Sequence, residues 1–160
     1  NISIKKINSS LMSFQGVKRR FTLLGKINKA SIYDDYAHHP TEIKASYDIA
    51  KQISSKKIII VFQPHRYSRT KILFDDFIKI LKKIDILFIL DIYAAGENPI
   101  KGVTSKNLVN KLNLTSKNVF YLGKNSNLHS NLKCYFEEEN TIIFMGAGSI
   151  TNFAYNLIKK

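Results

Sequence analysis

Cysteine, tryptophan and long apolar runs are scarce in this chain of 160 residues, which has one cysteine and no tryptophan. The single cysteine, Cys134, excludes an internal disulfide framework and is typical of a protein of the reducing cytoplasm. No apolar run reaches the roughly 18 residues of a membrane span, since the longest candidate, 84–92, contains Asp85 and Asp91. The first residues also lack the charged, apolar and small-residue pattern of a signal peptide. The composition therefore predicts a cytoplasmic protein with no membrane partner.

Acidic residues are also few, with 12 Asp and Glu against 25 Lys and Arg and a formal net charge of +13. Such a charge can indicate a nucleic-acid partner. The lysines are nevertheless spread through every predicted helix, whereas a nucleic-acid surface usually has clustered arginines with aromatic residues between them. Solvated helix faces are therefore the favoured explanation, and a basic nucleic-acid-binding domain remains an alternative.

Apolar runs and helical spacings alternate along the chain, whose length suits one domain. Strands are predicted at 20–27, 30–34, 57–62, 84–92, 118–122 and 141–145. Helices are predicted at 41–53, 70–83, 104–112, 126–137 and 149–158. This order predicts an α/β fold: a three-layer, Rossmann-like domain with a mostly parallel sheet flanked by helices and an N-terminal antiparallel hairpin.

The first segment, 1–13, has roughly helical spacing but is short and polar, and 14–16 end it. We interpret residues 1–16 as a linker or the tail of a preceding domain. The domain proper is then expected to span residues 17–160.

Two polar turns each follow a predicted strand, one at 34–42 and the other at 63–70. Two further strands end in 91–93 and in the turn 146–148. Because all carboxyl ends of a parallel sheet open on the same edge, we expect these turns to form one ligand site.

The histidines of the first turn do not predict a metal site. His38 and His39 are adjacent in an extended segment, so their side chains point to opposite sides. The chain also has no pair of histidines or cysteines at the usual ligand spacing. We therefore expect no dedicated metal site.

The glycine turn and the arginines each leave two interpretations open. Gly146, Ala147 and Gly148 follow a strand and open a helix, which suits an anion-facing turn or a turn needed only for packing. Two of the four arginines, Arg66 and Arg69, lie in one turn. Their planar forks could bind a carboxylate or phosphate, or could form structural salt bridges.

Five stretches together resemble a known family. They are Gly16–Phe21, Asp34–Glu42, Val61–Thr70, Asp91–Glu97 and Gly146–Ile150. From about residue 14 to the end, the chain resembles the C-terminal domain of the Mur ligases. The His-His-Pro turn and the His-Arg-Tyr-Ser-Arg-Thr turn resemble those of the member that adds L-alanine to UDP-N-acetylmuramate in peptidoglycan synthesis.

The resemblance implies an ATP-dependent ligase of three domains, of which this chain would be the third. The chain has no P-loop motif, so ATP and Mg²⁺ would be bound mainly by the missing domains, and the isolated chain would be inactive. The family reaction converts the muramate carboxylate to an acyl phosphate, which the amine of L-alanine then attacks.

The resemblance also implies roles for individual residues. The amino acid would be bound by Tyr36, His38, Arg66 and Arg69. His38 would also be the base that accepts a proton from the amine. Arg20 and Asp35 would contact the nucleotide. The turn Gly146, Ala147, Gly148 would lie near the reacting groups, and Ser149 stands where the family has an acidic residue, keeping only the ability to cap the following helix. A free-standing nucleotide-binding α/β module remains the second alternative.

Overall fold

The computed structural model describes residues 2–13, 16–116, 118–123 and 126–159. Its strands are β1 (Thr22–Ile27), β2 (Ala30–Asp35), β3 (Ile58–Phe62), β4 (Ile86–Leu90), β5 (Val119–Leu122) and β6 (Thr141–Met145). Its helices are α1 (Ile4–Met12), α2 (Pro40–Ile53), α3 (Tyr67–Ile72), α4 (Phe74–Leu81), α5 (Ser105–Leu112), α6 (Leu128–Leu132), the 3₁₀ helix η1 (Lys133–Tyr135) and α7 (Ile150–Ile158).

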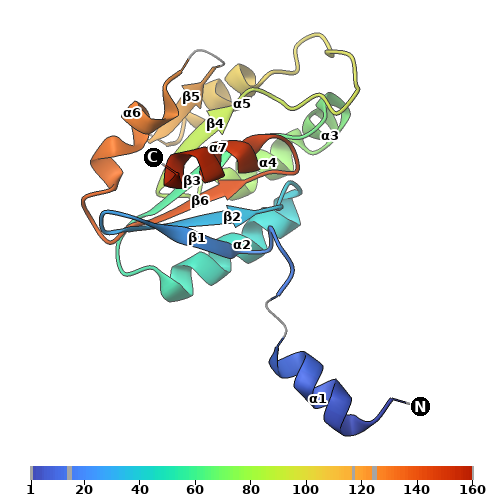
Figure 1. Cartoon of the computed structure of the whole chain (residues 1–160). Helices are drawn as coiled ribbons and strands as arrows, with labels where there is room; N and C mark the ends of the chain where they lie inside the picture. The colour runs from blue at the N-terminus through green and yellow to red at the C-terminus, as the bar shows by residue number, and fades with distance from the viewer. Residues whose placement is uncertain (1, 14–15, 117, 124–125, 160) are drawn as a thin grey trace.

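The strands form one sheet in the order β1-β2-β6-β3-β4-β5 (Figure 1). All neighbouring pairs are parallel except β1 and β2, which form the predicted antiparallel hairpin. The last strand, β6, is inserted between β2 and β3, so the carboxyl ends of β2, β6, β3 and β4 are adjacent. The predicted fold class is confirmed.

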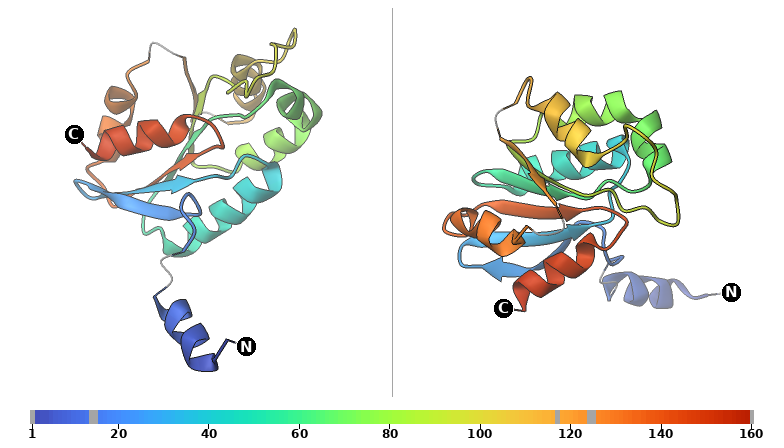
Figure 2. Two further views of the ribbon diagram at one scale, coloured as in Figure 1. Left: turned by 45° about the vertical axis from the view of Figure 1, so that its right-hand side comes forward. Right: turned by 90° about the horizontal axis from the view of Figure 1, so that it is seen from above.

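Helices cover both faces of the sheet, which gives the three layers seen in Figure 2. Side chains of α2, α4 and α5 pack on one face, and those of α6 and α7 pack on the other. The central strands β3, β4 and β6 are buried along their whole length. Alternate residues of β3 point to opposite faces, with Ile58, Ile60 and Phe62 in one core and Ile59 and Val61 in the other.

The helix predicted at 70–83 is wrong in its start and its continuity. The segment forms two helices, because α3 begins at Tyr67 and ends at Ile72, and α4 begins at Phe74 after the shared cap residue Leu73. The break turns Leu73 toward the core, whereas its apolar neighbour Ile72 is 79% exposed. The helix predicted at 126–137 is also shorter, since α6 begins after the N-cap Asn127 and gives way to η1.

Helix α1 has no buried residue and stands apart from the rest of the domain (Figures 1 and 2). It confirms the helical spacing of the first segment. Phe14 and Gln15, where that segment was predicted to end, lie outside the described residues. In the described part of the chain, no helix has the length and apolar character needed to cross a bilayer. The division at residues 16 and 17 stays a prediction.

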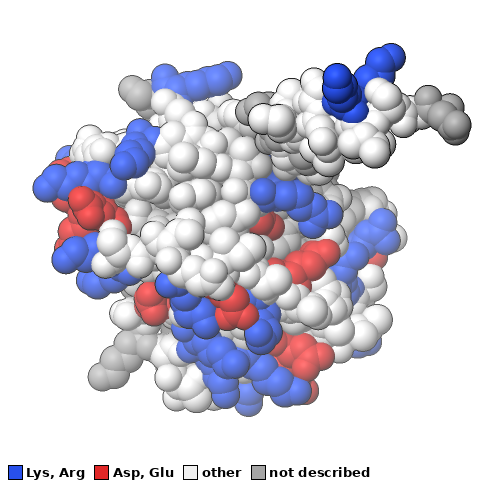
Figure 3. All heavy atoms as spheres, turned by 90° about the horizontal axis from the view of Figure 1, so that it is seen from below, with Lys and Arg blue, Asp and Glu red and all other residues white. Residues whose placement is uncertain are grey.

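Several lysines are paired with carboxylates on the surface. On the face shown in Figure 3, basic side chains lie beside acidic ones. Lys44 and Lys51 both contact Asp48, at 2.6 and 2.7 Å, and Lys79 contacts Asp76 at 2.9 Å. These exposed pairs fit the expected solvated helix faces, and each adds little stability.

Candidate functional site

The polar turns meet at the carboxyl edge of the sheet. Because β2, β6, β3 and β4 are neighbours, the turns that follow them lie side by side. The turn after β3 is tied to the one after β4 by a short bridge between His65 and Tyr93. The rings of His38 and His65, from the two turns singled out in the sequence, have centroids 5.6 Å apart. The structure therefore brings the two predicted turns together.

His38 has one ring nitrogen engaged and the other available. Its Nδ1 lies 2.9 Å from the carbonyl oxygen of Tyr36. A carbonyl only accepts, so Nδ1 carries a proton and donates, which leaves Nε2 of the neutral ring as an acceptor. The side chain is 16% exposed, and the Tyr36 ring packs perpendicular to it at 5.1 Å between centroids. This arrangement suits a base that takes a proton from a ligand.

His39 has a structural task at the start of α2. Its side chain accepts from the backbone N–H of Thr41, and the carboxylate of Glu42 accepts from the N–H groups of His38 and His39 at 3.0 and 3.2 Å. Pro40 occupies the first turn, where no N–H is needed. Burial acts to raise the pKa of Glu42, but these bonds and the His38 ring outweigh it and the pKa lies below its usual value. The capping box thus fixes the backbone that carries His38.

Arg66 and Arg69 form no ion pair in the described part of the chain, unlike Arg19. Arg66 is exposed and has a positive φ of 71°, a region that costs a non-glycine residue free energy. Its backbone N–H donates to the carbonyl of Tyr93 at 2.8 Å. The structural salt-bridge alternative for this pair is therefore unsupported, and both charges remain available to an anion.

Ser68, two residues after Arg66, holds the same turn in place through hydrogen bonds. Its N–H and hydroxyl donate to the two carboxylate oxygens of Glu97 at 3.0 and 2.6 Å. These bonds lower the pKa of Glu97 below its usual value. The loop after β4 thereby holds the start of α3.

Arg19 is a site residue that the sequence analysis missed. Its Nη2 donates to the carbonyl of Gly146 at 2.7 Å, and its guanidinium lies 4.7 Å from the centre of the Tyr36 ring. Its Nε lies 3.7 Å from the buried carboxylate of Asp34, whose pKa is raised by burial although Thr151 and Arg19 oppose that effect. The adjacent arginines Arg19 and Arg20 are visible in the sequence. Nothing in the sequence, however, distinguishes the role of Arg19 from that of Arg20.

Arg20 and Asp35, assigned to the nucleotide by resemblance, differ in their surroundings. Arg20 is exposed, with its guanidinium 5.6 Å from the centre of the Tyr36 ring, and is free to meet an anion. Asp35 is buried, and its two carboxylate oxygens accept from the N–H groups of Phe21 and Ala37 at 2.8 and 2.7 Å. Asp35 therefore joins the segment before β1 to the turn after β2, and its contact with the nucleotide stays a prediction.

The glycine turn after β6 is tightly packed. A Cβ on Gly146 would lie 2.9 Å from the carbonyl oxygen of Gln63, and one on Gly148 would lie 2.5 Å from Cγ of Tyr93. The side-chain oxygen of Gln63 accepts from the N–H of Ile150 at 3.0 Å, and its nitrogen donates to the Ser149 hydroxyl at 3.3 Å. Ser149 makes no side-chain cap, so Gln63 supplies the cap expected from it. These contacts favour the packing interpretation of the turn.

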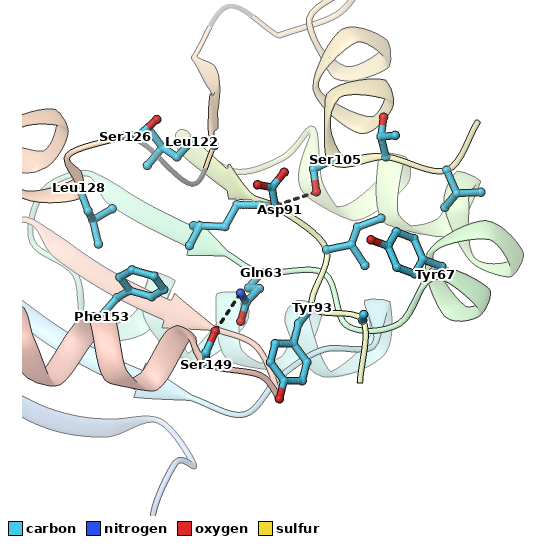
Figure 4. Close-up of a pocket in the computed structure, with 16 residues that line it drawn as sticks. Gln63, Tyr67, Asp91, Tyr93, Ser105, Leu122, Ser126, Leu128, Ser149 and Phe153 are labelled. Atoms are coloured by element: carbon cyan, nitrogen blue, oxygen red, sulfur yellow. Dashed lines mark hydrogen bonds between the residues drawn. The ribbon is translucent and has the colours of Figure 1, made fainter. Parts of the chain in front are cut away.

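A cavity of about 620 Å³ lies beside the polar turns, between the ends of β4, β5 and α7 (Figure 4). Its walls include Gln63, Asp91, Tyr93, Ser105, Leu122 and Phe153. The hydroxyl of Tyr121 donates to Asp91 at 2.5 Å, and this bond raises the pKa of Tyr121 to about 12. Tyr93 belongs to both regions, whereas the cavity walls, as far as the structure describes them, do not include His38, Arg66 or Arg69.

Among the described residues, no three His, Cys, Asp or Glu side chains are grouped so that they could hold a metal ion. Two acidic residues of the first turn, Asp35 and Glu42, are both engaged by backbone N–H groups. What these turns offer is therefore a ring nitrogen, guanidinium groups and hydroxyls.

Parallel strands whose polar turns meet at one edge define a class, the α/β domain that binds a small molecule at its carboxyl edge. Within that class, the family model described as Mur ligase, glutamate ligase domain matches residues 19–148, and the chain belongs to this family. The resemblance seen in the sequence is confirmed at this level.

Curated relatives agree with the family. The chain is 48% identical over 168 residues to a UDP-N-acetylmuramate–L-alanine ligase of Rickettsia canadensis, and 47% identical over 165 residues to that of Rickettsia felis. The alignments cover 100% and 98% of this chain but only 35% and 34% of the relatives. The chain thus spans about a third of the length of these relatives.

Solved structures share the fold. A UDP-N-acetylmuramate–alanine ligase of Thermotoga maritima superposes with a TM-score of 0.71 at 24% identity, covering 99% of this chain and 33% of that one. A murein peptide ligase of Psychrobacter arcticus superposes with a TM-score of 0.72 at 19% identity, with the same coverage of 99% and 33%.

Proposed function

We propose that this chain is the C-terminal domain of a cytoplasmic, ATP-dependent ligase that joins L-alanine to the carboxylate of UDP-N-acetylmuramate in peptidoglycan synthesis. The names of the Rickettsia relatives support the reaction, and their greater length supports two further domains in the same protein. The observation that carries the role of this domain is the closeness of the His38 and His65 rings, 5.6 Å apart, with the Arg69 guanidinium bonded to His65 and with neither Arg66 nor Arg69 in an ion pair in the described part of the chain.

This arrangement suits an α-amino acid. The carboxylate of alanine would meet Arg66 and Arg69, whose planar forks match its geometry. Its ammonium group must lose a proton before the nitrogen can attack, and Nε2 of His38 is the acceptor offered at this edge. The Tyr36 ring, held against Arg19 and His38, would form the wall next to the small side chain.

The reaction proceeds through an acyl phosphate. Phosphoryl transfer from ATP activates the muramate carboxylate, the alanine nitrogen attacks its carbonyl carbon, and phosphate leaves as the amide forms. Mg²⁺, when bound, would neutralise the charge of the phosphates, and its ligands belong to the missing domains in this proposal. Of the two residues assigned to the nucleotide, exposed Arg20 fits an anion, whereas Asp35 fits as a support for the turn.

The test uses the three-domain enzyme that carries this domain. Replacing Arg66 or Arg69 by lysine keeps the charge but removes the fork. We expect kcat/KM for alanine to fall about 10- to 150-fold, the cost of a lost charge-assisted bond of about 1.5–3 kcal/mol, while the KM for ATP stays within about twofold. Lys106→Arg, on the exposed face of α5, is the matched control. An unchanged alanine KM in both arginine variants would reject the clamp.

A further inference from the structure

His65 lies between the two groups proposed to handle the amino acid. Its ring stacks on Tyr93 at 5.5 Å between centroids and lies 5.6 Å from the ring of His38. Its backbone is held by the bridge to Tyr93, and the guanidinium of Arg69 reaches it from the first turn of α3. The family resemblance gave this residue no role in the sequence analysis.

The contact with Arg69 fixes the position of the His65 proton. Nη1 of Arg69 lies 3.2 Å from Nδ1 of His65 and 3.3 Å from its carbonyl oxygen. A guanidinium can only donate, so Nδ1 must accept, and the proton of the neutral ring then resides on Nε2. The tautomer is therefore set by the fold.

The surroundings also keep His65 neutral. Burial lowers the pKa of His65 below its ordinary value, and the charges of Arg69 and Arg66 lower it further. The charge of Glu97 acts in the opposite direction. Charging the His65 ring would add a second proton on Nδ1, where it would face the N–H of Arg69. This geometry also disfavours the charged ring.

His38 has the opposite tautomer. Its Nδ1 donates to the carbonyl of Tyr36, so its Nε2 accepts, whereas the Nε2 of His65 donates. Two neighbouring rings thus present one acceptor and one donor at the same edge of the sheet. An α-amino acid carries the matching pair, an amine that must give up a proton and a carboxylate that accepts hydrogen bonds.

We propose that His65 is a positioning residue: its Nδ1 holds the guanidinium of Arg69 in place, and its Nε2–H donates to the carboxylate of the amino acid whose amine faces His38. The positioning of Arg69 is a property of this chain alone, whereas the carboxylate contact rests on the proposed function. The two parts therefore need separate measurements.

The first measurement is long-range ¹H–¹⁵N NMR of the imidazole rings in the 160-residue chain. We expect His65 to show a protonated Nε2 and an unprotonated Nδ1 at pH 7.5, and His38 to show the reverse. Replacing Arg69 by methionine removes the donor and should turn the His65 signals into those of a tautomer mixture, without changing His38. A His65 ring with its proton on Nδ1, or one unaffected by Arg69→Met, overturns the positioning role.

The second measurement compares three variants in the three-domain enzyme. His65→Asn keeps an acceptor near the place of Nδ1, His65→Gln keeps a donor near the place of Nε2, and His65→Phe keeps only the stacking on Tyr93. We expect His65→Phe to raise the alanine KM at least about tenfold with a smaller change in kcat, and each polar variant to recover part of the loss. Melting curves confirm that the variants fold.

An alanine KM that stays within twofold in a folded His65→Phe variant overturns the carboxylate contact. Equal defects in all three variants also overturn it, because they would show that restoring a donor or an acceptor at residue 65 recovers nothing. If the wild-type enzyme does not use alanine, the proposed function and the carboxylate contact both fail, while the NMR result still decides whether His65 positions Arg69.

Discussion

The guanidinium of Arg19 donates to the carbonyl of Gly146 at 2.7 Å, joining the segment before β1 to the turn after β6. The same side chain faces the buried carboxylate of Asp34 and covers the Tyr36 ring. One arginine thereby connects the first strand pair, the aromatic wall of the site and the glycine turn. Its neighbour Arg20 is exposed, so the two adjacent arginines have different tasks.

Replacing Arg19 by alanine should therefore destabilise the domain. The change leaves the Gly146 carbonyl without its donor and Asp34 without a nearby cation, and we expect a loss of about 1–3 kcal/mol in the free energy of unfolding. Arg20→Ala is the matched control and should stay within about 0.5 kcal/mol of wild type, because it removes an exposed side chain. Urea denaturation of both variants measures this difference. Equal stabilities would show that the Arg19 contacts contribute nothing net.

The sequence was sufficient for most of the fold, because its strands are unusually apolar. Segments such as 58–62 and 141–145 are short, apolar and rich in isoleucine, which favours strands buried on both faces, and helical spacing separates them. The break at Leu73 was not predictable in this way, because Ile72 and Leu73 are both apolar and either could face the core. In the folded domain, Leu73 packs against the core and Ile72 is exposed.

The site was predictable in outline for a geometric reason. Turns that follow parallel strands share an edge, so the clustering of 34–42 with 63–70 follows from the fold class. The sheet order was needed to show that β6 lies between β2 and β3, and hence that Gln63 reaches the start of α7. The ring tautomers depend on single hydrogen bonds from Arg69 and to Tyr36, which no sequence pattern encodes.

A methyl group at Gly148 should disturb the site by displacing the Tyr93 ring, which stacks on His65. Its Cβ would lie 2.5 Å from Cγ of Tyr93 and 2.7 Å from the side-chain oxygen of Gln63, so the Tyr93 ring must move. We expect Gly148→Ala to cost about 1–3 kcal/mol of stability by overpacking and to weaken the stacking on His65. The His65 NMR signals and thermal melting report these two effects.

Gly102→Ala is the control for Gly148→Ala, because it introduces backbone strain without crowding. Gly102 has a positive φ of 78° but no atom within 4 Å of an added Cβ, so this change should cost only about 1 kcal/mol and leave the His65 signals unchanged. Unaltered His65 signals in a folded Gly148→Ala variant would contradict the proposed route from the glycine turn to the histidine.

The lowered pKa of His65 should make the domain less stable in mild acid. An unfolded histidine titrates near pH 6.5, whereas burial and the charges of Arg69 and Arg66 place the folded pKa lower. Between these two values the unfolded chain binds a proton that the folded chain does not, so the free energy of unfolding decreases as the pH falls through 6.5. The contribution of His65 is fully present above that pH.

Replacing His65 by phenylalanine should remove this part of the pH dependence. We expect the loss of stability between pH 7 and pH 5, measured by urea denaturation, to be smaller in His65→Phe than in wild type. The comparison cancels the contribution of the other groups, which the two proteins share. Parallel curves for the two proteins would show that His65 does not resist protonation in the folded state.

His38 is the proposed base of the three-domain enzyme. Its Nε2 is available because Nδ1 is held by the Tyr36 carbonyl, and removing the ring deletes the acceptor without touching the arginines. We expect His38→Ala to lower kcat at neutral pH by about 10²–10⁴-fold, the usual size of general base catalysis, with a smaller change in the alanine KM. The defect should shrink as the pH rises, because the alanine amine then loses its proton to water.

His39→Asn provides the control for this experiment. His39 accepts from the N–H of Thr41 as the N-cap of α2, and asparagine is a good replacement at that position. The variant should therefore keep its melting temperature and its kcat, although it changes the neighbouring histidine. If His38→Ala instead kept the wild-type kcat at neutral pH, the amine would have to lose its proton to another group, and the pairing of an acceptor on His38 with a donor on His65 would have no part in the chemistry. A kcat defect that is constant with pH would lead to a different conclusion: His38 would then orient the amine without accepting its proton, since only a lost base is compensated by a higher concentration of the free amine.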